Sequence, residues 1–138
     1  MEAIDIPDDE YDILGLIYQS YQREGEKNIA GSYYTPQQVA YNMTCSFNFS
    51  NHQKFLDPCC GSGAFLLSVP AKTPLQIFGI DNDETAVMIA KINLLLKYSR
   101  YEFNPQIYCF DYLSNDTNAL ISSILNTEFD YIATNPPW

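Results

Sequence analysis

The stretch from residue 54 to residue 134 alternates between short apolar runs and segments with helical spacing, and this alternation limits the possible folds most strongly. The apolar runs predict four strands, and the segments between them predict three helices. The predicted strands are residues 54–57, 75–80, 107–110 and 129–134, and the predicted helices are residues 64–69, 84–98 and 118–125. Strands that alternate with helices form a parallel sheet covered on both faces. Because crossovers are right-handed, we expect a Rossmann-like, doubly wound α/β fold with a mostly parallel sheet in strand order 3-2-1-4.

The first part of the chain predicts helices that precede the sheet. Apolar residues recur at helical spacing in residues 9–24. We divide the chain into a helical lead-in, residues 1–30, and one domain, residues 31–138. Whether residues 9–24 also contact a partner is left open by the sequence.

A second early helix is predicted by Thr35-Pro36, which has the pattern of an N-cap followed by a proline at the first helical position. This helix is expected to run from Pro36 to about Phe47. The residues expected on one face of it are Val39, Met43 and Phe47.

The fourth predicted strand, residues 129–134, would form a bare, apolar edge of the sheet. Natural proteins usually cover or charge such edges. We therefore expect the sheet to be truncated after strand 4, with further structure missing after Trp138. The exposed edge could also support a homo-oligomer.

The charge of the chain limits what it can bind. The net charge is −10, and six of the 17 acidic residues fall within the first twelve positions. The chain therefore lacks the basic surface that holds a phosphate backbone, and we expect it to bind DNA poorly by itself. It has no apolar run of about 18 residues and no signal-peptide pattern, which predicts no membrane association and a cytoplasmic location. The four cysteines show no metal-ligand spacing, so we expect reduced thiols and no metal.

Residues 57–65, with the sequence DPCCGSGAF, follow the first predicted strand and lead into a helix. In doubly wound sheets, ligands bind at this point, beside the carboxyl end of strand 1. Gly61 and Gly63 would let the backbone approach a ligand closely. Leu66 stands where a nicotinamide-binding motif would have its third glycine, which disfavours a dehydrogenase. The alternative interpretation is a tight strand-to-helix turn.

Acidic residues follow the next two predicted strands. Asp81, in the sequence GIDND, lies where a carboxylate binds the two hydroxyls of a ribose. Asp83 is better interpreted as the N-cap or a first-turn acid of the following helix, which is a structural role. Asp111 could accept from an adenine amino group, and its alternative role is a turn or helix-cap carboxylate.

Asn135-Pro136-Pro137-Trp138 follows the fourth predicted strand. Prolines stiffen the backbone, so the Asn135 amide oxygen and the Pro136 carbonyl can act as fixed acceptors. Trp138 offers a flat face for stacking. Such a group suits a planar base that carries an exocyclic NH2, although a proline-rich loop is the plain alternative.

Taken in order, DPCCGSGAF, GIDND, the FDYL of residues 110–113 and NPPW resemble the motifs of N6-adenine DNA methyltransferases that use S-adenosylmethionine. Residues 31–36, with the sequence GSYYTP, resemble the additional cofactor motif of these enzymes. In type I modification subunits and fused restriction–methylation enzymes this motif precedes the glycine motif. The resemblance covers about residues 31–138.

The resemblance implies a set of cofactor-binding residues. The residues that match these positions are Tyr34, Thr35, Pro36, Asp57, Cys60, Gly61, Gly63, Asp81, Asn82, Asp111 and Tyr112. By resemblance, Thr35 lies near the methionine carboxylate, Asp81 binds the ribose and Asp111 binds the adenine amine. Asn82 stands where the family often has an apolar residue that packs on the adenine, and Tyr112 lies beside the ring.

The resemblance also implies catalytic residues, which are Asn135, Pro136, Pro137 and Trp138. Asn135 and Pro136 match the pair that accepts from the target amine. Trp138 matches the stacking position, where Tyr or Phe is more common. The implied reaction is direct methyl transfer to adenine N6 in a base flipped out of DNA, within restriction–modification.

The family's catalytic domain continues past this tetrapeptide and works with a DNA-recognition region or partner subunit. Two accounts are open: a truncated chain or gene fragment, or one half of a split enzyme. We expect cofactor-site geometry but negligible methylation by this chain alone. DNA would bind through the missing parts, with a specificity subunit or a complementary fragment as a further partner. The alternative functions are methylation of protein glutamine or RNA bases, and non-catalytic binding of a cofactor or partner.

Overall fold

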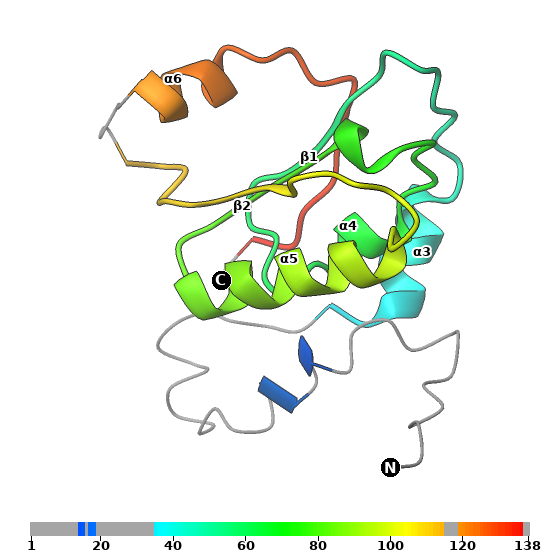
Figure 1. Ribbon diagram of the computed structural model, residues 1–138, viewed down its shortest axis with the longest axis horizontal. Helices are drawn as coiled ribbons and strands as arrows, with labels where there is room; N and C mark the ends of the chain where they lie inside the picture. The colour runs from blue at the N-terminus through cyan, green and yellow to red at the C-terminus, as the bar shows by residue number, and fades with distance from the viewer. Residues whose placement is uncertain (1–13, 16, 19–34, 115–118, 137–138) are drawn as a thin grey trace.

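The computed structural model describes residues 14–15, 17–18, 35–114 and 119–136 of the chain (Figure 1). Four strands form one sheet: β1 (Phe55–Asp57), β2 (Ile77–Asp81), β3 (Gln106–Cys109) and β4 (Tyr131–Ile132). Their order is β3-β2-β1-β4, and every neighbouring pair is parallel. The predicted doubly wound α/β fold and the strand order 3-2-1-4 are confirmed.

The register of the sheet is set around the central strand β1. Phe55 pairs with Ile77 of β2 and with Tyr131 of β4. The next residue, Leu56, pairs with Ile132 on the β4 side. Because side chains alternate along a strand, the Phe55 row points to one face of the sheet and the Leu56 row points to the other.

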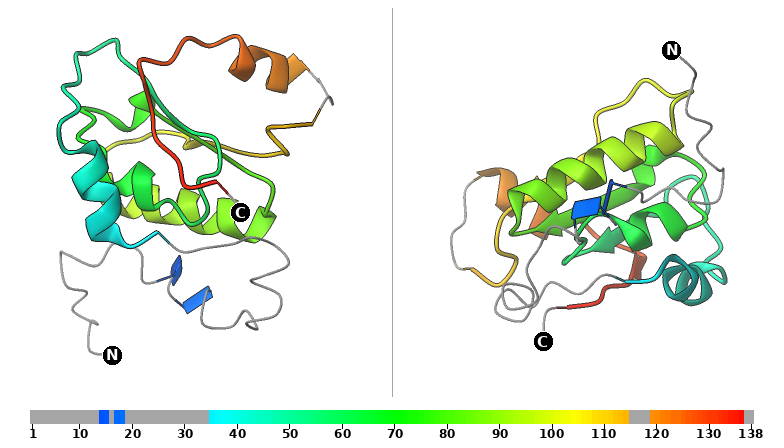
Figure 2. Two further views of the ribbon diagram at one scale, coloured as in Figure 1. Left: turned by 180° about the vertical axis from the view of Figure 1, so that it is seen from behind. Right: turned by 90° about the horizontal axis from the view of Figure 1, so that it is seen from below.

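Helices cover the two faces of the sheet unequally. The helices are α3 (Gln37–Thr44), α4 (Ala64–Ser68), α5 (Glu84–Lys97) and α6 (Ala119–Leu125), and a short 3-10 helix (Pro74–Gln76) precedes β2. Figures 1 and 2 show α3, α4 and α5 on one side of the sheet and α6 on the other. The two layers of a doubly wound fold are therefore both present.

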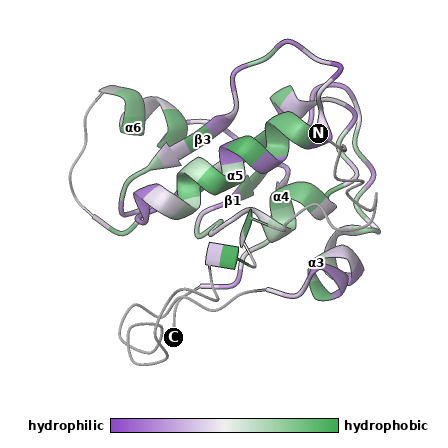
Figure 3. Cartoon of the chain, turned by 60° about the horizontal axis from the view of Figure 1, so that its bottom comes forward, coloured by the Kyte–Doolittle hydropathy of each residue, from purple (hydrophilic) through white to green (hydrophobic). Residues whose placement is uncertain are grey.

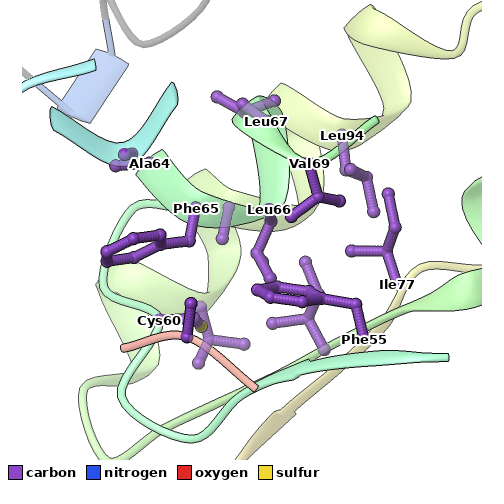
Figure 4. Close-up of a cluster of buried hydrophobic side chains, with 14 of the residues drawn as sticks. Phe55, Cys60, Ala64, Phe65, Leu66, Leu67, Val69, Ile77 and Leu94 are labelled. Carbon is purple, nitrogen blue, oxygen red and sulfur yellow. The ribbon is translucent and has the colours of Figure 1, made fainter. Parts of the chain in front are cut away.

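The larger hydrophobic core lies between the sheet and the layer of α3, α4 and α5 (Figure 4). Phe55, Leu66, Ile77 and Leu94 are completely buried in it. The core on the opposite face is small. Its buried members are Leu56, Phe78, Ile80 and Ile124. The sheet is thus anchored mainly from the α4–α5 side.

Helix α5 forms where the sequence predicted it, because it has both a cap and an apolar face. The Asp83 carboxylate accepts hydrogen bonds from the backbone N–H groups of Thr85 at 2.8 Å and Ala86 at 3.3 Å. The predicted N-cap role of Asp83 is therefore confirmed. The helix also carries apolar residues on its exposed side (Figure 3), and these are Met88, Ile92, Leu95 and Leu96.

The prediction for helix α3 was partly wrong. Its N-cap is Pro36 rather than Thr35, no side chain caps it, and it ends at Thr44 rather than near Phe47. The buried face consists of Ala40 and Thr44, whereas Val39 is 46% exposed and Met43 is 51% exposed. Ala40 is part of the larger core and α3 lies against α4, so a small residue rather than a large one lies on the buried face.

Two aromatic contacts explain why the ends of α3 and β4 differ from the prediction. Phe47 lies beyond α3 and stacks on Tyr131, with ring centroids 4.6 Å apart. Phe129, predicted to start β4, instead packs edge-on against Phe78 at 5.1 Å. Phe47 and Phe129 therefore pack against the two cores although they lie outside the helices and strands.

Strand β4 is short and lies at an edge of the sheet. Within the described residues it pairs with β1 alone, and Ile132 is 58% exposed. The prediction that strand 4 forms an apolar edge is confirmed for this part of the chain. Among the helices described, none has the length and apolar character needed to cross a membrane.

Candidate active site

Most of the predicted site residues that the structure describes lie at one edge of the sheet. Asp57 ends β1, Asp81 ends β2, Asp111 comes two residues after β3, and Asn135 comes three residues after β4. Parallel strands place their carboxyl ends at the same edge, which is where ligands bind in open α/β sheets. Tyr34, Pro137 and Trp138 lie outside the described residues, so their predicted roles remain predictions.

The glycine-rich residues after β1 form a tight loop tied to both central strands. The backbone N–H of Cys60 donates to the carbonyl oxygen of Ile80 at 2.8 Å, and that of Gly63 donates to the Cys60 carbonyl at 2.9 Å. Gly61 and Gly63 have φ values of 51° and 104°, which L side chains rarely adopt. The loop therefore needs glycine at both predicted positions.

Two residues that the sequence analysis did not assign also support this loop. Asn93 is a buried polar residue of α5, and its side-chain NH2 donates to the Ser62 carbonyl at 3.1 Å. Gly79 lets the loop approach β2, because a Cβ atom there would lie 2.9 Å from Leu66 Cδ1 and 3.1 Å from Cys60 Sγ. The available signals were an amide within an otherwise apolar helix face and a glycine inside a buried strand.

Asp81 connects the loop to the end of β2. Its Oδ2 accepts from the Gly61 N–H at 2.7 Å, and its Oδ1 accepts from the Asp83 N–H at 2.9 Å. A carboxylate offers about four lone-pair sites, so two of them are left for hydroxyl donors. Asn82 is exposed next to it, and its backbone carbonyl accepts a weak bond from Cys109 Sγ at 3.7 Å.

Asp111 has a turn role, which was the alternative to a cofactor role. Its Oδ1 accepts from the Leu113 N–H at 2.9 Å. Both Asp111 and its neighbour Tyr112 are exposed. The turn uses one lone pair of the carboxylate, so the carboxylate keeps capacity for a second donor.

Asp57 is buried at the base of the loop and is 1% exposed. Its Oδ1 accepts from the Cys59 N–H at 3.1 Å. Burial raises the pKa of Asp57 from its ordinary 3.8 to about 7; the Thr134 hydroxyl and the Cys59 N–H oppose this shift, and the Asp81 carboxylate adds to it. Near neutral pH this carboxyl is therefore poised between its two protonation states.

The thiols of the loop are poor nucleophiles. Burial, followed by the charges of Asp57 and Asp81, raises the pKa of Cys60 well above its usual range. Burial also raises the pKa of Cys59, with Asp57 as the next cause. Since the thiolate is the reactive form, neither cysteine is suited to covalent catalysis. Among the described residues, no group of His, Cys, Asp or Glu could hold a metal ion.

Asn135 and Thr35 are joined although they lie 100 positions apart in the sequence. The Asn135 Nδ2 donates to Thr35 Oγ1 at 3.2 Å. This bond uses the NH2 of the amide, so the contact leaves the Asn135 Oδ1 oxygen available as an acceptor. Pro36 and Pro136, which follow the two bonded residues, are both exposed. The GSYYTP and NPPW motifs thus meet at this contact.

The chain is similar in sequence to known methyltransferases. The chain is 34% identical over 131 residues to the Type II methyltransferase M.VspI of Vibrio sp. (strain 343), covering 91% of this chain and 29% of that protein. It is 30% identical over 144 residues to the Type I restriction enzyme MjaVII methylase subunit of Methanocaldococcus jannaschii, covering 98% of this chain and 24% of that subunit. The chain thus spans between about a quarter and three tenths of these relatives.

A solved structure supports the fold. The cryo-EM structure of the DrdV–DNA complex aligns with a TM-score of 0.65 and 20% identity, covering 88% of this chain and 15% of that one. The family N-6 DNA Methylase matches residues 9–138, which is nearly the entire sequence. This chain therefore belongs to the N-6 DNA Methylase family.

Proposed function

We propose that this chain binds S-adenosylmethionine at the carboxyl ends of β1, β2 and β3, and that the complete protein methylates adenine N6 in DNA as part of restriction–modification. The observation that carries the proposal is the hydrogen bond between Asn135 and Thr35. It joins the expected base-acceptor motif to the expected cofactor motif. Family membership supports the same chemistry.

The residues at this edge fit the proposed cofactor. A Cβ atom built on Gly61 would meet nothing within 4 Å, so open space lies above the loop. Asp57, Asp81 and Asp111 surround the loop closely enough to raise the pKa of Cys59. S-adenosylmethionine carries a sulfonium and an ammonium group, and carboxylates stabilise such positive charges.

S-adenosylmethionine would supply an electrophilic methyl group. Asn135 Oδ1 and the Pro136 carbonyl would each accept a hydrogen bond from the adenine amine, which orients the nitrogen lone pair toward that methyl group. As the N–CH3 bond forms, the S–CH3 bond would break, and the methylated amine would release one proton after the transfer. Thr35 holds the Asn135 amide through its NH2, so the oxygen rather than the nitrogen faces the base. Rate enhancement would come from positioning and electrostatics, and no enzyme nucleophile is required.

DNA binding in this proposal comes from other parts of the complete protein. The net charge of −10 gives this chain no basic footprint, and the chain spans a quarter to three tenths of its relatives. A complete protein of the type I kind would also work with a specificity subunit. We also propose a cytoplasmic location, where DNA and S-adenosylmethionine are both available.

Titration calorimetry of the chain with S-adenosylmethionine tests the first half of the proposal. We expect saturable binding by the native chain, with the affinity of Asp81→Asn reduced at least about tenfold because a charge-assisted bond to the ribose is weakened. Glu102→Gln is the matched control, since Glu102 is exposed and precedes the amino end of β3. Absence of both binding heat and a thermal shift in the native chain would refute cofactor binding.

A further inference from the structure

The hydroxyl of Thr134 is a buried polar group that the proposed function does not use. Its Oγ1 atom is shielded from solvent and makes no hydrogen bond of acceptable geometry with the described residues. A buried hydroxyl without a partner is unfavourable, because it has lost its water and gained nothing in return. A group left in this state needs an explanation.

The side chains beside Thr134 indicate which group its hydroxyl can bond. The hydroxyl lowers the pKa of both Asp57 and Cys59, so it lies beside both side chains. The other groups that face Asp57 are the Cys59 N–H, the Asp81 carboxylate and the thiols of Cys59 and Cys60. The S–H groups of these cysteines are weak donors, so the Thr134 hydroxyl is the strongest uncharged side-chain donor among these groups.

Hydrogen bonds hold the residues on both sides of Thr134. Ala133 N–H donates to the Leu56 carbonyl at 3.3 Å, which fixes the chain before Thr134 to β1. Asn135 follows immediately, and its amide is bonded to Thr35. Because Thr134 lies between these two anchors, a hydrogen bond that fixes its side chain on Asp57 would also restrain the backbone that carries Asn135.

We propose that Thr134 is a positioning residue whose hydroxyl donates to the ionised Asp57 carboxylate and thereby aligns the Asn135 acceptor. The inference rests on the proposed function, because a cationic cofactor beside Asp57 would favour the ionised carboxylate. Cofactor binding would then favour the hydrogen bond from the Thr134 hydroxyl to the Asp57 carboxylate. This bond would orient the Asn135 oxygen toward the target base. The Thr134 hydroxyl thus links the cofactor-binding residues around Asp57 to the Asn135 acceptor.

The side-chain NH2 resonances of Asn135 test this link by NMR on the isotopically labelled chain. In the native chain without cofactor, we expect these resonances to titrate together with the Asp57 carboxyl. Thr134→Val, which keeps the shape but removes the hydroxyl, should abolish the co-titration and raise the pKa of Asp57. Thr134→Ser, which keeps the hydroxyl, should preserve the co-titration. Asp57→Asn should remove the titration altogether.

Cofactor titrations of the same variants give a second measurement. We expect Thr134→Val to weaken S-adenosylmethionine binding about fivefold, and Thr134→Ser to stay within about twofold of the native chain. Replacing an unpaired buried hydroxyl by a methyl group should not unfold the chain. If Thr134→Val did unfold, Thr134→Ser would still allow a comparison with the native chain.

The outcomes separate this inference from the proposed function. If the native chain binds no cofactor but Asn135 still follows Asp57, the proposed function fails while the link through Thr134 stands. If the cofactor binds and Thr134→Val matches the native chain in both titrations, the inference is overturned. A merely structural role for Thr134 would change stability but not the co-titration.

Discussion

The two halves of the candidate site are held in very different ways. The glycine-loop half, residues 57–68 with the end of β2, is braced through bonds to Ile80, Asp81 and Asn93. Lys97 of α5 also donates to the Leu67 carbonyl near the end of α4. The acceptor half, residues 131–136 with Thr35, consists of a two-residue edge strand and a few single contacts. The glycine-loop half is therefore pre-organised, whereas the acceptor half is open to adjustment.

Core truncation should affect the two halves most unequally. Leu66 is completely buried beneath the glycine loop, whereas Ile132 of the acceptor half is 58% exposed. Leu66→Ala should lower the free energy of unfolding by about 2–5 kcal/mol, because it leaves a cavity. Ile132→Ala should lower it by less than about 1 kcal/mol. Urea denaturation of both variants measures the difference, and similar losses would show that the acceptor half is as firmly packed as the loop.

The pH dependence of stability probes Asp57, which lies between the halves. Its pKa is raised from 3.8 to about 7 in the folded chain, so the folded state keeps the proton over a range where the unfolded state has released it. The unfolded state then binds fewer protons, and stability falls as pH rises from about 4 to about 7. We expect the native chain to lose roughly 2–4 kcal/mol relative to Asp57→Asn over this range.

Asp57→Asn is itself the control for the other titrating groups, since it can still accept from Cys59 through its amide oxygen. Urea denaturation of both chains at several pH values measures the effect. Parallel curves for the two chains would mean that Asp57 has an ordinary pKa and that its burial carries no electrostatic cost.

The sequence predicted the parts of the molecule that depend on local patterns. Strand alternation was enough to give the order 3-2-1-4, and the residues around Asp83 were enough to give the cap of α5. The glycine loop was predicted at the end of β1, where it lies. These features depend on neighbouring residues and on general rules of handedness, so one sequence contains the necessary information.

The features that the sequence did not predict depend on contacts between distant residues. Thr35 was expected to cap α3, but its hydroxyl instead accepts from Asn135. Ala40 lies on the buried face of α3, within the larger core, although larger apolar residues lie on the exposed side. The unpaired hydroxyl of Thr134 follows from its place beside Asp57. Partners of this kind cannot be identified from spacing along the chain.

Two glycine substitutions sharpen the description of the loop half. Gly79→Ala should cost about 1–3 kcal/mol, since its Cβ would press on Leu66 and Cys60. Gly61→Ala should cost about 1–2 kcal/mol through its positive φ alone, because no atom lies near the new Cβ. Thermal denaturation compares the two costs, and calorimetry adds a distinction. Gly61→Ala should weaken S-adenosylmethionine binding, because its methyl group enters the open space above the loop.

The control for these substitutions is Ser99→Ala at an exposed position, which should change neither stability nor binding. If Gly79→Ala were as stable as the native chain, the close approach of the loop to β2 would not be needed for the fold. If Gly61→Ala bound S-adenosylmethionine normally, the open space above the loop would not be where the cofactor lies.

The smallest expected effect belongs to the acceptor half, in the contact between Thr35 and Asn135. A double-mutant cycle with Thr35→Val and Asn135→Ala isolates it, and we expect a coupling free energy of about 0.5–1 kcal/mol in urea denaturation. The bond is single, uncharged and only partly buried, so it cannot contribute as much to stability as the buried side chain of Leu66. A coupling near zero would mean that Asn135 turns freely before the base arrives. A coupling of several kcal/mol would mean that the acceptor half is as rigid as the glycine loop, and the contrast between the halves would be lost.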